Sequence, residues 1–329
     1  MVKAIVVRQT GGPEVLQYTD IKVSAPGPGE LRLRQTAIGV NFIDLYHRSG
    51  LYPAKINDDG YFIPGMEGVG RIEAVGDGVT SLKVGDRVCY GNGPMGGYAE
   101  ERLIPAASVV KCPPQLKDEQ VAGMMLRGLT VWYLVRALHE LKPGETVLMH
   151  AAAGGIGLIF CQWARHIGAT VIGTVGSEEK AAVAKAAGCT HTVLYKTEKN
   201  WAAKVRELSS GKGVRVAYDG VGKDTLLGSL DCLAPRGLLV SFGNASGPPP
   251  AIEPSQLAAK GSVFMTRPRL VDYVDNLQDY ARGCAELFDV VTKGIVKVDI
   301  GNSYGLAQAA HAHSDLESRI TTGSTILVV

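Results

Sequence analysis

The six cysteines of this 329-residue chain are scattered, and no two of them form a C-x-x-C pair. Zinc sites and disulfide frameworks show clustered cysteine spacing, so the pattern predicts reduced, mostly buried thiols. The seven histidines are also dispersed. The one close pair, His311 and His313, would point to different faces of a helix. The sequence therefore offers no good candidate for a metal site.

Long apolar runs and excess charge are lacking as well. No apolar run approaches the ~20 residues of a membrane span, and the apolar part of MVKAIVVRQTGGPE is too short for a secretory signal. We therefore expect a cytoplasmic protein. With 34 basic and 32 acidic residues, there is no reason to expect binding to nucleic acid or anionic membranes. The length predicts two domains.

From about residue 146 to 266 apolar strands alternate with helices, which predicts a parallel sheet covered on both faces, within a domain that we place at residues 124–266. Six strands match a doubly wound, dinucleotide-binding Rossmann domain. The predicted strands are 146–150, 170–175, 191–195, 214–220, 238–243 and 262–266. The helix after the first strand should end at Gly168 as its C-cap.

Residues 1–123 are punctuated by glycine and proline and contain short β-branched strands, which predicts an antiparallel, barrel-like domain. After residue 266 we expect a helix over 271–293, a strand VKVDIG, a helix over 306–318 and a final strand STILVV. The simplest assembly gives residues 267–329 to the first domain, so that the Rossmann domain is inserted within it.

The stretch HAAAGGIGLIF lies between the first predicted strand and its helix but departs from the G-x-G-x-x-G pattern, because Ala152 replaces the first glycine. Gly154 would let the backbone approach a pyrophosphate, and Gly157 would let the helix pack on the sheet. Amides at the helix N-terminus would bind the pyrophosphate. Alanine at the first position requires a turn that avoids positive φ there.

The end of the second strand selects the cofactor. NAD sites place an acidic residue about 20 positions after the turn to bind the ribose 2′-hydroxyl, but here Gly176 and Ser177 occupy that place and Lys180 follows. A hydroxyl and a lysine suit a 2′-phosphate, so we predict NADPH. We interpret Glu178 and Glu179 as acids that complement the helix dipole.

Four motifs together resemble a known family: HAAAGGIGLIFCQWA, GVNFIDLYHRSGLYP, LRGLTVWYL and VSFGNASG. They are similar to those of the zinc-independent, zeta-crystallin-like quinone oxidoreductases of the medium-chain dehydrogenase/reductase superfamily. The resemblance implies an α/β protein with a GroES-like catalytic domain, an inserted Rossmann domain and a cleft between them. It also implies NADPH as electron donor, no flavin, and a homodimer.

The zinc enzymes of that superfamily have ligands where this chain has Asn41, Met66 and Arg127. Zinc needs thiolate, imidazole or carboxylate ligands, so the resemblance implies a metal-free site. Small quinones are electrophilic and need little Lewis-acid help, which leaves mainly a positioning task.

The resemblance also assigns residues. Asn41, Asp44 and Tyr46 would line the nicotinamide end of the cleft, with Tyr52 near its mouth; Tyr46 would either assist chemically or serve only in packing. The implied cofactor contacts are Thr130, Gly154, Gly155, Ile156, Gly176, Ser177, Lys180, Tyr195, Phe242, Gly243, Asn244, Arg267 and Arg319. Arg267 and Arg319 are equally compatible with surface salt bridges.

Three functions remain open from the sequence. The first is an NADPH:quinone reductase, the second an NADPH-dependent reductase of enone or alkenal double bonds, and the third a moonlighting structural or RNA-binding role. The near-neutral charge and the lack of a basic-aromatic cluster disfavour RNA binding. The sequence does not say which quinone is reduced, or whether one electron or a hydride is transferred.

The interpretation of Lys180 leads to a test. In Lys180→Ala, the KM for NADPH should rise by roughly tenfold or more, because a charge-assisted hydrogen bond to the 2′-phosphate is lost. The KM for NADH, which lacks that phosphate, should change far less. Steady-state kinetics with both cofactors measures this, and equal effects on the two would contradict the assignment.

Overall fold

The computed structural model describes residues 1–329, which divide into two compact units. The first unit comprises residues 1–130, 276–292 and 298–329, and the second comprises residues 131–275 and 293–297. The chain therefore leaves the first unit and later returns to it. The two main changeovers follow Thr130 and Asp275, and residues 293–297 form a short return to the second unit. The sequence predicted boundaries after residues 123 and 266.

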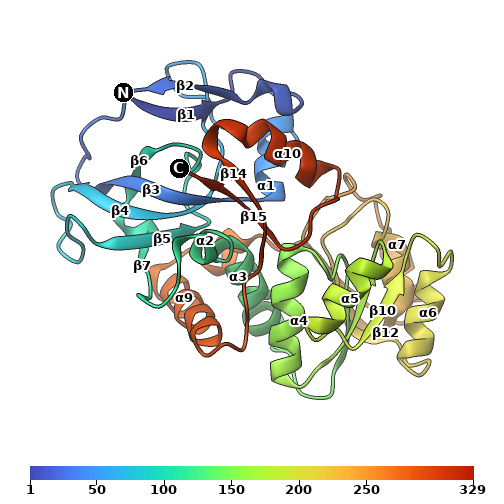
Figure 1. The fold of residues 1–329 in the computed structure, drawn as a ribbon. Coiled ribbons are helices and arrows are strands. Elements are labelled where there is room, and N and C mark those ends of the chain that lie inside the picture. Colours follow the sequence, from blue (N-terminus) through green and yellow to red (C-terminus); the bar gives the residue numbers. More distant parts are fainter. The chain divides into compact units, whose positions relative to one another are not determined.

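The first unit contains all the antiparallel strand pairs and both chain termini (Figure 1). Its elements are β1 (Val2–Val6), β2 (Gln17–Ile21), β3 (Glu30–Val40), α1 (Phe42–Ser49), β4 (Glu67–Val75), β5 (Arg87–Gly91), β6 (Glu101–Pro105), β7 (Val110–Lys111), α2 (Asp118–Ala122), α3 (Met125–Trp132, crossing the changeover), α9 (Leu277–Thr292), β14 (Ile300–Gly305), α10 (Ala309–Glu317) and β15 (Ser324–Val328).

The main sheet of this unit joins the two ends of the chain. Its strand order is β14-β15-β3-β4-β5-β7, with β6 also paired to β3, and all pairs except β14–β15 are antiparallel. In Figure 1 the red β15 lies beside the blue β3, and Val40 pairs with Thr325. Ile38, Leu45 and Leu327 pack in one buried cluster. The C-terminal strands therefore complete the N-terminal sheet.

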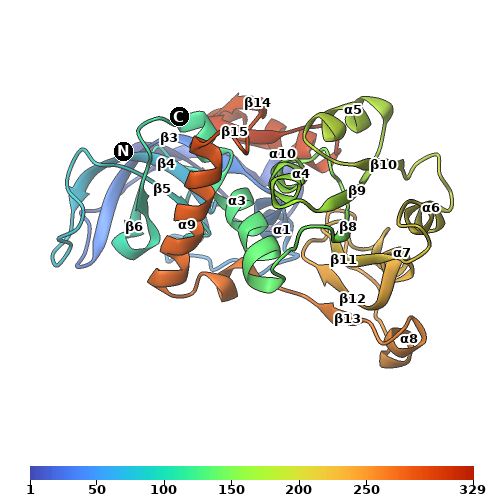
Figure 2. The same ribbon diagram turned by 90° about the horizontal axis from the view of Figure 1, so that it is seen from below.

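The second unit alternates strands and helices (Figure 2). Its elements are a π-helical segment (Tyr133–Leu138), β8 (Thr146–Met149), α4 (Gly155–Ile167), β9 (Thr170–Val175), α5 (Glu178–Ala186), β10 (His191–Leu194), α6 (Trp201–Leu208), β11 (Val214–Asp219), α7 (Leu226–Cys232), β12 (Leu233–Ser241), α8 (Pro254–Ala259) and β13 (Phe264–Thr266).

All six strands of the second unit are parallel, in the order β10-β9-β8-β11-β12-β13. This is the doubly wound dinucleotide-binding arrangement, so the predicted fold class is confirmed. Leu148, Ile172 and Leu239 are fully buried in one cluster, as expected for strands covered on both faces. Gly168 ends α4 with φ +94°, as predicted. The carboxyl ends of all six strands meet at one edge of the sheet.

Two predictions for the C-terminal region are wrong in detail. The helix predicted over 271–293 is a short 3₁₀ turn, Leu270–Tyr273, followed by α9. The strand predicted at VKVDIG is displaced, because β14 begins only at Ile300. At Lys297 the backbone N–H and C=O bond the side-chain amide of Gln162 instead (2.8 and 2.9 Å). That amide takes the place of a strand partner.

None of the helices is both long and apolar enough to span a membrane. All six cysteines are free thiols, five of them buried and Cys112 half-buried.

Candidate functional site

The turn between β8 and α4 accommodates the alanine that replaces the first glycine. The residue with a left-handed backbone is Ala151 (φ +52°), and Ala152 lies outside that region. Ala152 is fully buried, and a Cβ built on Gly173 of β9 would lie 2.6 Å from its methyl group. The turn therefore packs tightly on β9. The expectation that Ala152 avoids positive φ is confirmed, and the strain lies one residue earlier.

The first turn of α4 presents free amides. Gly154 is the N-cap (φ −80°), and Gly154, Gly155 and Ile156 are all half-buried. The first N–H groups of a helix have no partner within it and lie at the positive end of the helix dipole, so they suit an anion. A Cβ on Gly157 would lie 2.4 Å from the Ala151 carbonyl oxygen. Gly157 therefore lets α4 approach the preceding turn closely, whereas the sequence predicted that it would let the helix pack on the sheet.

The end of β9 gathers hydroxyl and ammonium groups. Ser177 is the N-cap of α5, and its Oγ accepts a hydrogen bond from the Lys180 backbone N–H (3.3 Å). A Cβ on Gly176 would lie 3.3 Å from the Tyr195 hydroxyl and 3.5 Å from Cε of Lys196. The residues predicted at this position are thus brought together at the ends of β9 and β10.

Lys196 is a member of this group that the sequence analysis missed. Burial lowers the pKa of Lys180, and repulsion from the Lys196 ammonium lowers it further. The positive charges of Lys180 and Lys196 therefore act on the same region, and their combined field would attract an anion there. The available signal was the dipeptide Tyr195-Lys196 at the end of the third strand of the Rossmann domain. Glu178 and Glu179 lie in the first turn of α5, as predicted.

The remaining predicted residues of the second unit follow β12 and β13. A Cβ on Gly243 would lie 2.4 Å from the Gly220 carbonyl oxygen, so glycine is required there. Phe242 is half-buried and Asn244 is buried. Nη1 of Arg267 donates to the carbonyl oxygens of Ser241 and Gly243 (2.9 and 3.0 Å). Arg267 therefore holds this loop through backbone groups.

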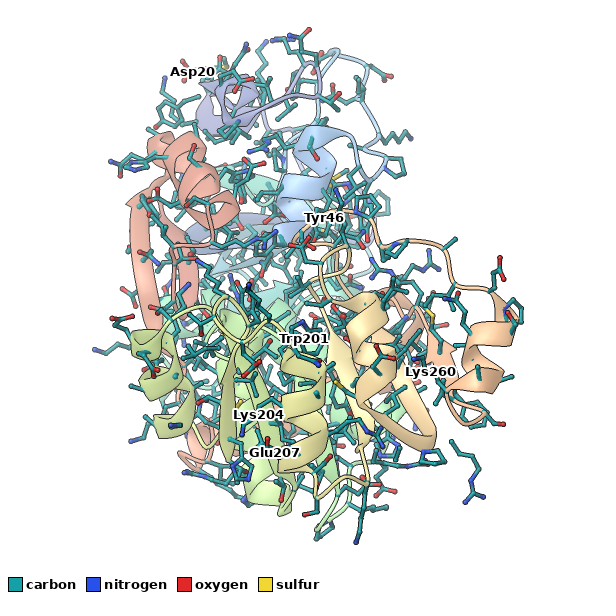
Figure 3. All side chains as sticks on the ribbon, turned by 90° about the vertical axis from the view of Figure 1, so that its right-hand side faces the viewer. Asp20, Tyr46, Trp201, Lys204, Glu207 and Lys260 are labelled. Atoms are coloured by element: carbon teal, nitrogen blue, oxygen red, sulfur yellow. The ribbon has the colours of Figure 1, made fainter.

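In the first unit, α1 begins at the predicted residues. Asn41 follows β3, and its backbone N–H donates to Oδ2 of Asp44 (2.8 Å), a bond typical of a helix N-terminus. Tyr46 is half-buried on the next turn of α1 (Figure 3). Its ring meets that of Tyr52 edge-on with centroids 5.1 Å apart. Asn41, Asp44, Tyr46 and Tyr52 therefore form one local group around α1.

Two of the three positions that hold zinc ligands in the zinc enzymes, Asn41 and Arg127, form a buried polar cluster with Glu67, and the third is the half-buried Met66. Nδ2 of Asn41 donates to Oε2 of Glu67 (2.7 Å), and Nη1 of Arg127 lies 3.5 Å from the same oxygen. Arg127 also donates to the Val40 carbonyl. Glu67, next to Met66 in the motif GMEG, is fully buried. Arg127 supplies the positive charge of this cluster, which is paired with the carboxylate of Glu67. No group of three or more His, Cys, Asp or Glu side chains is placed to hold a metal ion.

A second buried series of hydrogen bonds connects Asp44 to the C-terminal helix α10. The Tyr98 hydroxyl donates to Oδ2 of Asp44 (3.2 Å) and lies 2.9 Å from Nε2 of His313 on α10. Burial raises the pKa of Asp44 to about 7, with repulsion from Glu67 adding to the effect. Burial, with Arg48 adding to it, lowers the pKa of His313 to about 3, so this imidazole is neutral.

Two predicted cofactor contacts belong to the first unit. The hydroxyl of Thr130 donates to the Leu126 carbonyl of its own helix (2.8 Å) and is buried. Arg319 has a left-handed backbone (φ +58°) and is exposed. Their assignment to the cofactor stays a prediction.

Comparison with protein families matches both units. Residues 27–114 match the alcohol dehydrogenase GroES-like domain, and residues 155–277 match the zinc-binding dehydrogenase domain. Together with the two-unit fold, these matches define a medium-chain dehydrogenase/reductase.

Individual relatives narrow the assignment. Quinone oxidoreductase of Pseudomonas aeruginosa is 50% identical over 328 residues and covers the full length of both chains. The structure of the Escherichia coli quinone oxidoreductase complexed with NADPH superposes with a TM-score of 0.96 at 43% identity, covering 99% of this chain and 100% of the other. A 2-haloacrylate reductase from a Burkholderia species is 46% identical over 331 residues, covering 100% of this chain and 99% of the other. The chain belongs to the quinone oxidoreductase family, as its motifs predicted.

The raised pKa of Asp44 leads to a pH-dependent test. Its folded-state value of about 7 exceeds the ordinary 3.8, so the native state binds a proton that the unfolded state has lost between those values. This contribution to stability is present at low pH and is lost as pH rises from about 4 to about 7. Asp44→Asn should remove a slope of at most about 1.4 kcal/mol per pH unit in the free energy of unfolding.

Urea denaturation from pH 4.5 to 7.5 measures that slope. Asp58→Asn, in an exposed loop, is the matched control and should retain the wild-type slope. The pKa of Glu67 is also raised by burial, so both variants retain that second contribution. An unchanged slope in Asp44→Asn would contradict the protonated, buried carboxyl.

Proposed function

We propose that this protein is an NADPH-dependent reductase of small quinones and that it uses neither metal nor flavin. The observation that carries the cofactor assignment is the pair Lys180 and Lys196 beside the Ser177 N-cap. This group replaces the carboxylate that an NAD site would place after the second strand. The first turn of α4, which follows the neighbouring strand β8, fits a pyrophosphate. The second unit is therefore the NADPH-binding domain, and the first is the catalytic domain.

Each cofactor-binding segment has a distinct task in this proposal. The amides of Gly155 and Ile156 bind the pyrophosphate. The N–H of Gly154 donates to the Ala151 carbonyl oxygen (2.8 Å), so Gly154 contributes by letting the backbone approach the pyrophosphate. The 2′-phosphate is held by the Ser177 hydroxyl and the two ammonium groups, with Tyr195 and Gly176 forming the adjacent wall. The loop Phe242–Asn244, held by Arg267, borders the nicotinamide half. When bound, NADPH supplies the reducing equivalents.

The candidate substrate residues lie around α1. Tyr46 and Tyr52 offer aromatic faces to a planar ring, and the Tyr46 hydroxyl is a hydrogen-bond donor for a quinone oxygen. Asn41 and Asp44 orient the start of α1 through the bond between them. The position of a Lewis acid is taken by Arg127, whose charge is already paired with Glu67. A substrate that is itself electrophilic fits this site.

The alternative activity is reduction of an activated carbon–carbon double bond. A relative named 2-haloacrylate reductase is 46% identical over the full chain, so this scaffold is compatible with acceptors other than quinones. A structural or RNA-binding role has less support, because the net charge is only +2.

The choice between the two activities is tested by NADPH oxidation in the presence of a small quinone or an α,β-unsaturated aldehyde. The kcat/KM for the quinone should be higher by roughly tenfold or more, because the site lacks a group that strongly polarises an isolated carbonyl. A chelator such as EDTA should leave the rate unchanged. A faster reaction with the aldehyde, or loss of activity with EDTA, would contradict the proposal.

We also propose that the protein is a cytoplasmic homodimer that assembles through β13. This strand is at the edge of the parallel sheet, where unpaired backbone groups can pair with another strand. Phe264 and Met265 on this strand are 62% and 37% exposed. A second copy would supply both the missing strand and an identical apolar surface.

Phe264→Glu should shift the protein from twice the 34.8 kDa chain mass to the mass of one chain, because each dimer would bury two opposed carboxylates. Light scattering after size-exclusion chromatography measures this. Ile320→Glu changes an equally exposed apolar residue of the other unit (67% exposed) and should leave the mass unchanged. A monomeric wild type would refute the interface.

A further inference from the structure

A fully buried imidazole lies directly beneath the candidate pyrophosphate turn. His150 follows β8, is 1% exposed, and is bonded through both ring nitrogens. Its Nδ1 lies 2.8 Å from Oγ1 of Thr174, and its Nε2 lies 2.9 Å from Oγ of Ser229. The ring edge meets Trp201, which Figure 3 labels at the start of α6, at 90° with centroids 5.1 Å apart.

The chain of hydrogen bonds continues to a buried carboxylate. Oγ of Ser229 donates to Oδ2 of Asp219 (2.8 Å). Oδ1 of Asp219 accepts from the backbone N–H groups of Val221 and Gly222 (2.9 Å each) and from the Thr225 hydroxyl (2.8 Å). Both oxygens of this carboxylate therefore have hydrogen-bond donors, three on Oδ1 and one on Oδ2. These four hydrogen bonds offset the cost of burying the polar oxygens of Asp219.

These bonds allow only one direction of donation. The Ser229 hydroxyl donates its one proton to Asp219 or to the Thr225 carbonyl oxygen (2.8 and 3.0 Å). In either case it accepts from Nε2–H of His150. Burial lowers the pKa of His150, so the ring is neutral and its Nδ1 is an acceptor. Thr174 must therefore donate to Nδ1. The order Thr174 to His150 to Ser229 to Asp219 is an uninterrupted donor chain across three parallel strands.

The chain connects segments that bind different parts of the cofactor. His150 immediately precedes the strained Ala151 of the pyrophosphate turn. Thr174 stands three residues before Ser177, the N-cap at the 2′-phosphate group. The backbone supports the same connection, since the Ala152 N–H donates to the Thr174 carbonyl oxygen (3.1 Å). A polar chain inside an apolar sheet costs desolvation, and apolar residues would pack these strands equally well.

We propose that His150 is a positioning residue that holds the pyrophosphate turn and the 2′-phosphate loop in a fixed register, so that one NADPH molecule engages both. The inference rests on the proposed NADPH site. It assigns part of the preference for NADPH to the imidazole and the Thr174 hydroxyl, neither of which is a predicted contact. NADH needs only the pyrophosphate turn and depends less on the register.

Thr174→Val removes the hydroxyl, and Thr174→Ser retains it, so the two variants form a matched pair. Dissociation constants for NADPH and NADH are measured by fluorescence of the bound nicotinamide, which does not require turnover. In Thr174→Val the Kd for NADPH should rise about tenfold and the Kd for NADH by less than about threefold, as expected for loss of one buried hydrogen bond. Thr174→Ser should restore both values.

Equal weakening of both cofactors in Thr174→Val, or no weakening, would overturn the inference. If wild type fails to bind NADPH, it is the proposed function that fails instead. Ser229→Ala interrupts the same chain at its other end and provides the measurement if Thr174→Val does not fold. Histidine ¹⁵N chemical shifts in wild type give an independent readout: His150 should be neutral with the proton on Nε2, and a proton on Nδ1 would overturn the direction of donation.

Discussion

The parallel pairing of β8 with β9 is the constraint on which the candidate cofactor site depends. Thr146–Met149 pair with Thr170–Gly173, so the turn after β8 and the loop after β9 emerge at the same edge of the sheet. Ala152 packs on Gly173 and bonds the Thr174 carbonyl, which leaves little freedom between them. The free amides of α4 and the ammonium groups of Lys180 and Lys196 are consequently carried by one rigid framework, and a dinucleotide with two separated phosphate groups matches it.

The first unit meets a different constraint, because its zinc-ligand positions lie in a buried region. Replacing ligands by Asn41 and Arg127 leaves Glu67 in place, and an uncompensated buried carboxylate would be costly. Arg127 provides the countercharge, and Asn41 connects Glu67 to Asp44 through its side chain and backbone. With two carboxyl groups and one guanidinium in the cluster, a proton on Asp44 reduces the excess negative charge. Burial is the main cause of the raised pKa of Asp44, and repulsion from the Glu67 carboxylate adds to it.

Local pattern was sufficient for much of the fold and for part of the site. The six strands of the second unit, the Gly168 cap and the residues Ser177 and Lys180 follow from apolar periodicity, turn chemistry and position after a strand. Lys196, Tyr98 and His313 did not, since each gains its meaning from a partner distant in sequence. The strand predicted at VKVDIG failed for the same reason: the side chain of Gln162, far upstream, bonds that backbone.

The alanine in the glycine-rich turn is explained by local backbone conformation together with contacts to residues distant in sequence. A glycine at position 152 would be free to adopt positive φ, but it would leave a gap over Gly173, and a side chain on Gly173 would collide with Ala152. The small-residue pair is thus a packing unit, and the positive φ is adopted by Ala151, which is exposed. His150 immediately precedes that strained residue and is itself fixed by its bonds to Thr174 and Ser229. The missing glycine and the buried histidine are therefore two parts of one solution to the geometry of this turn.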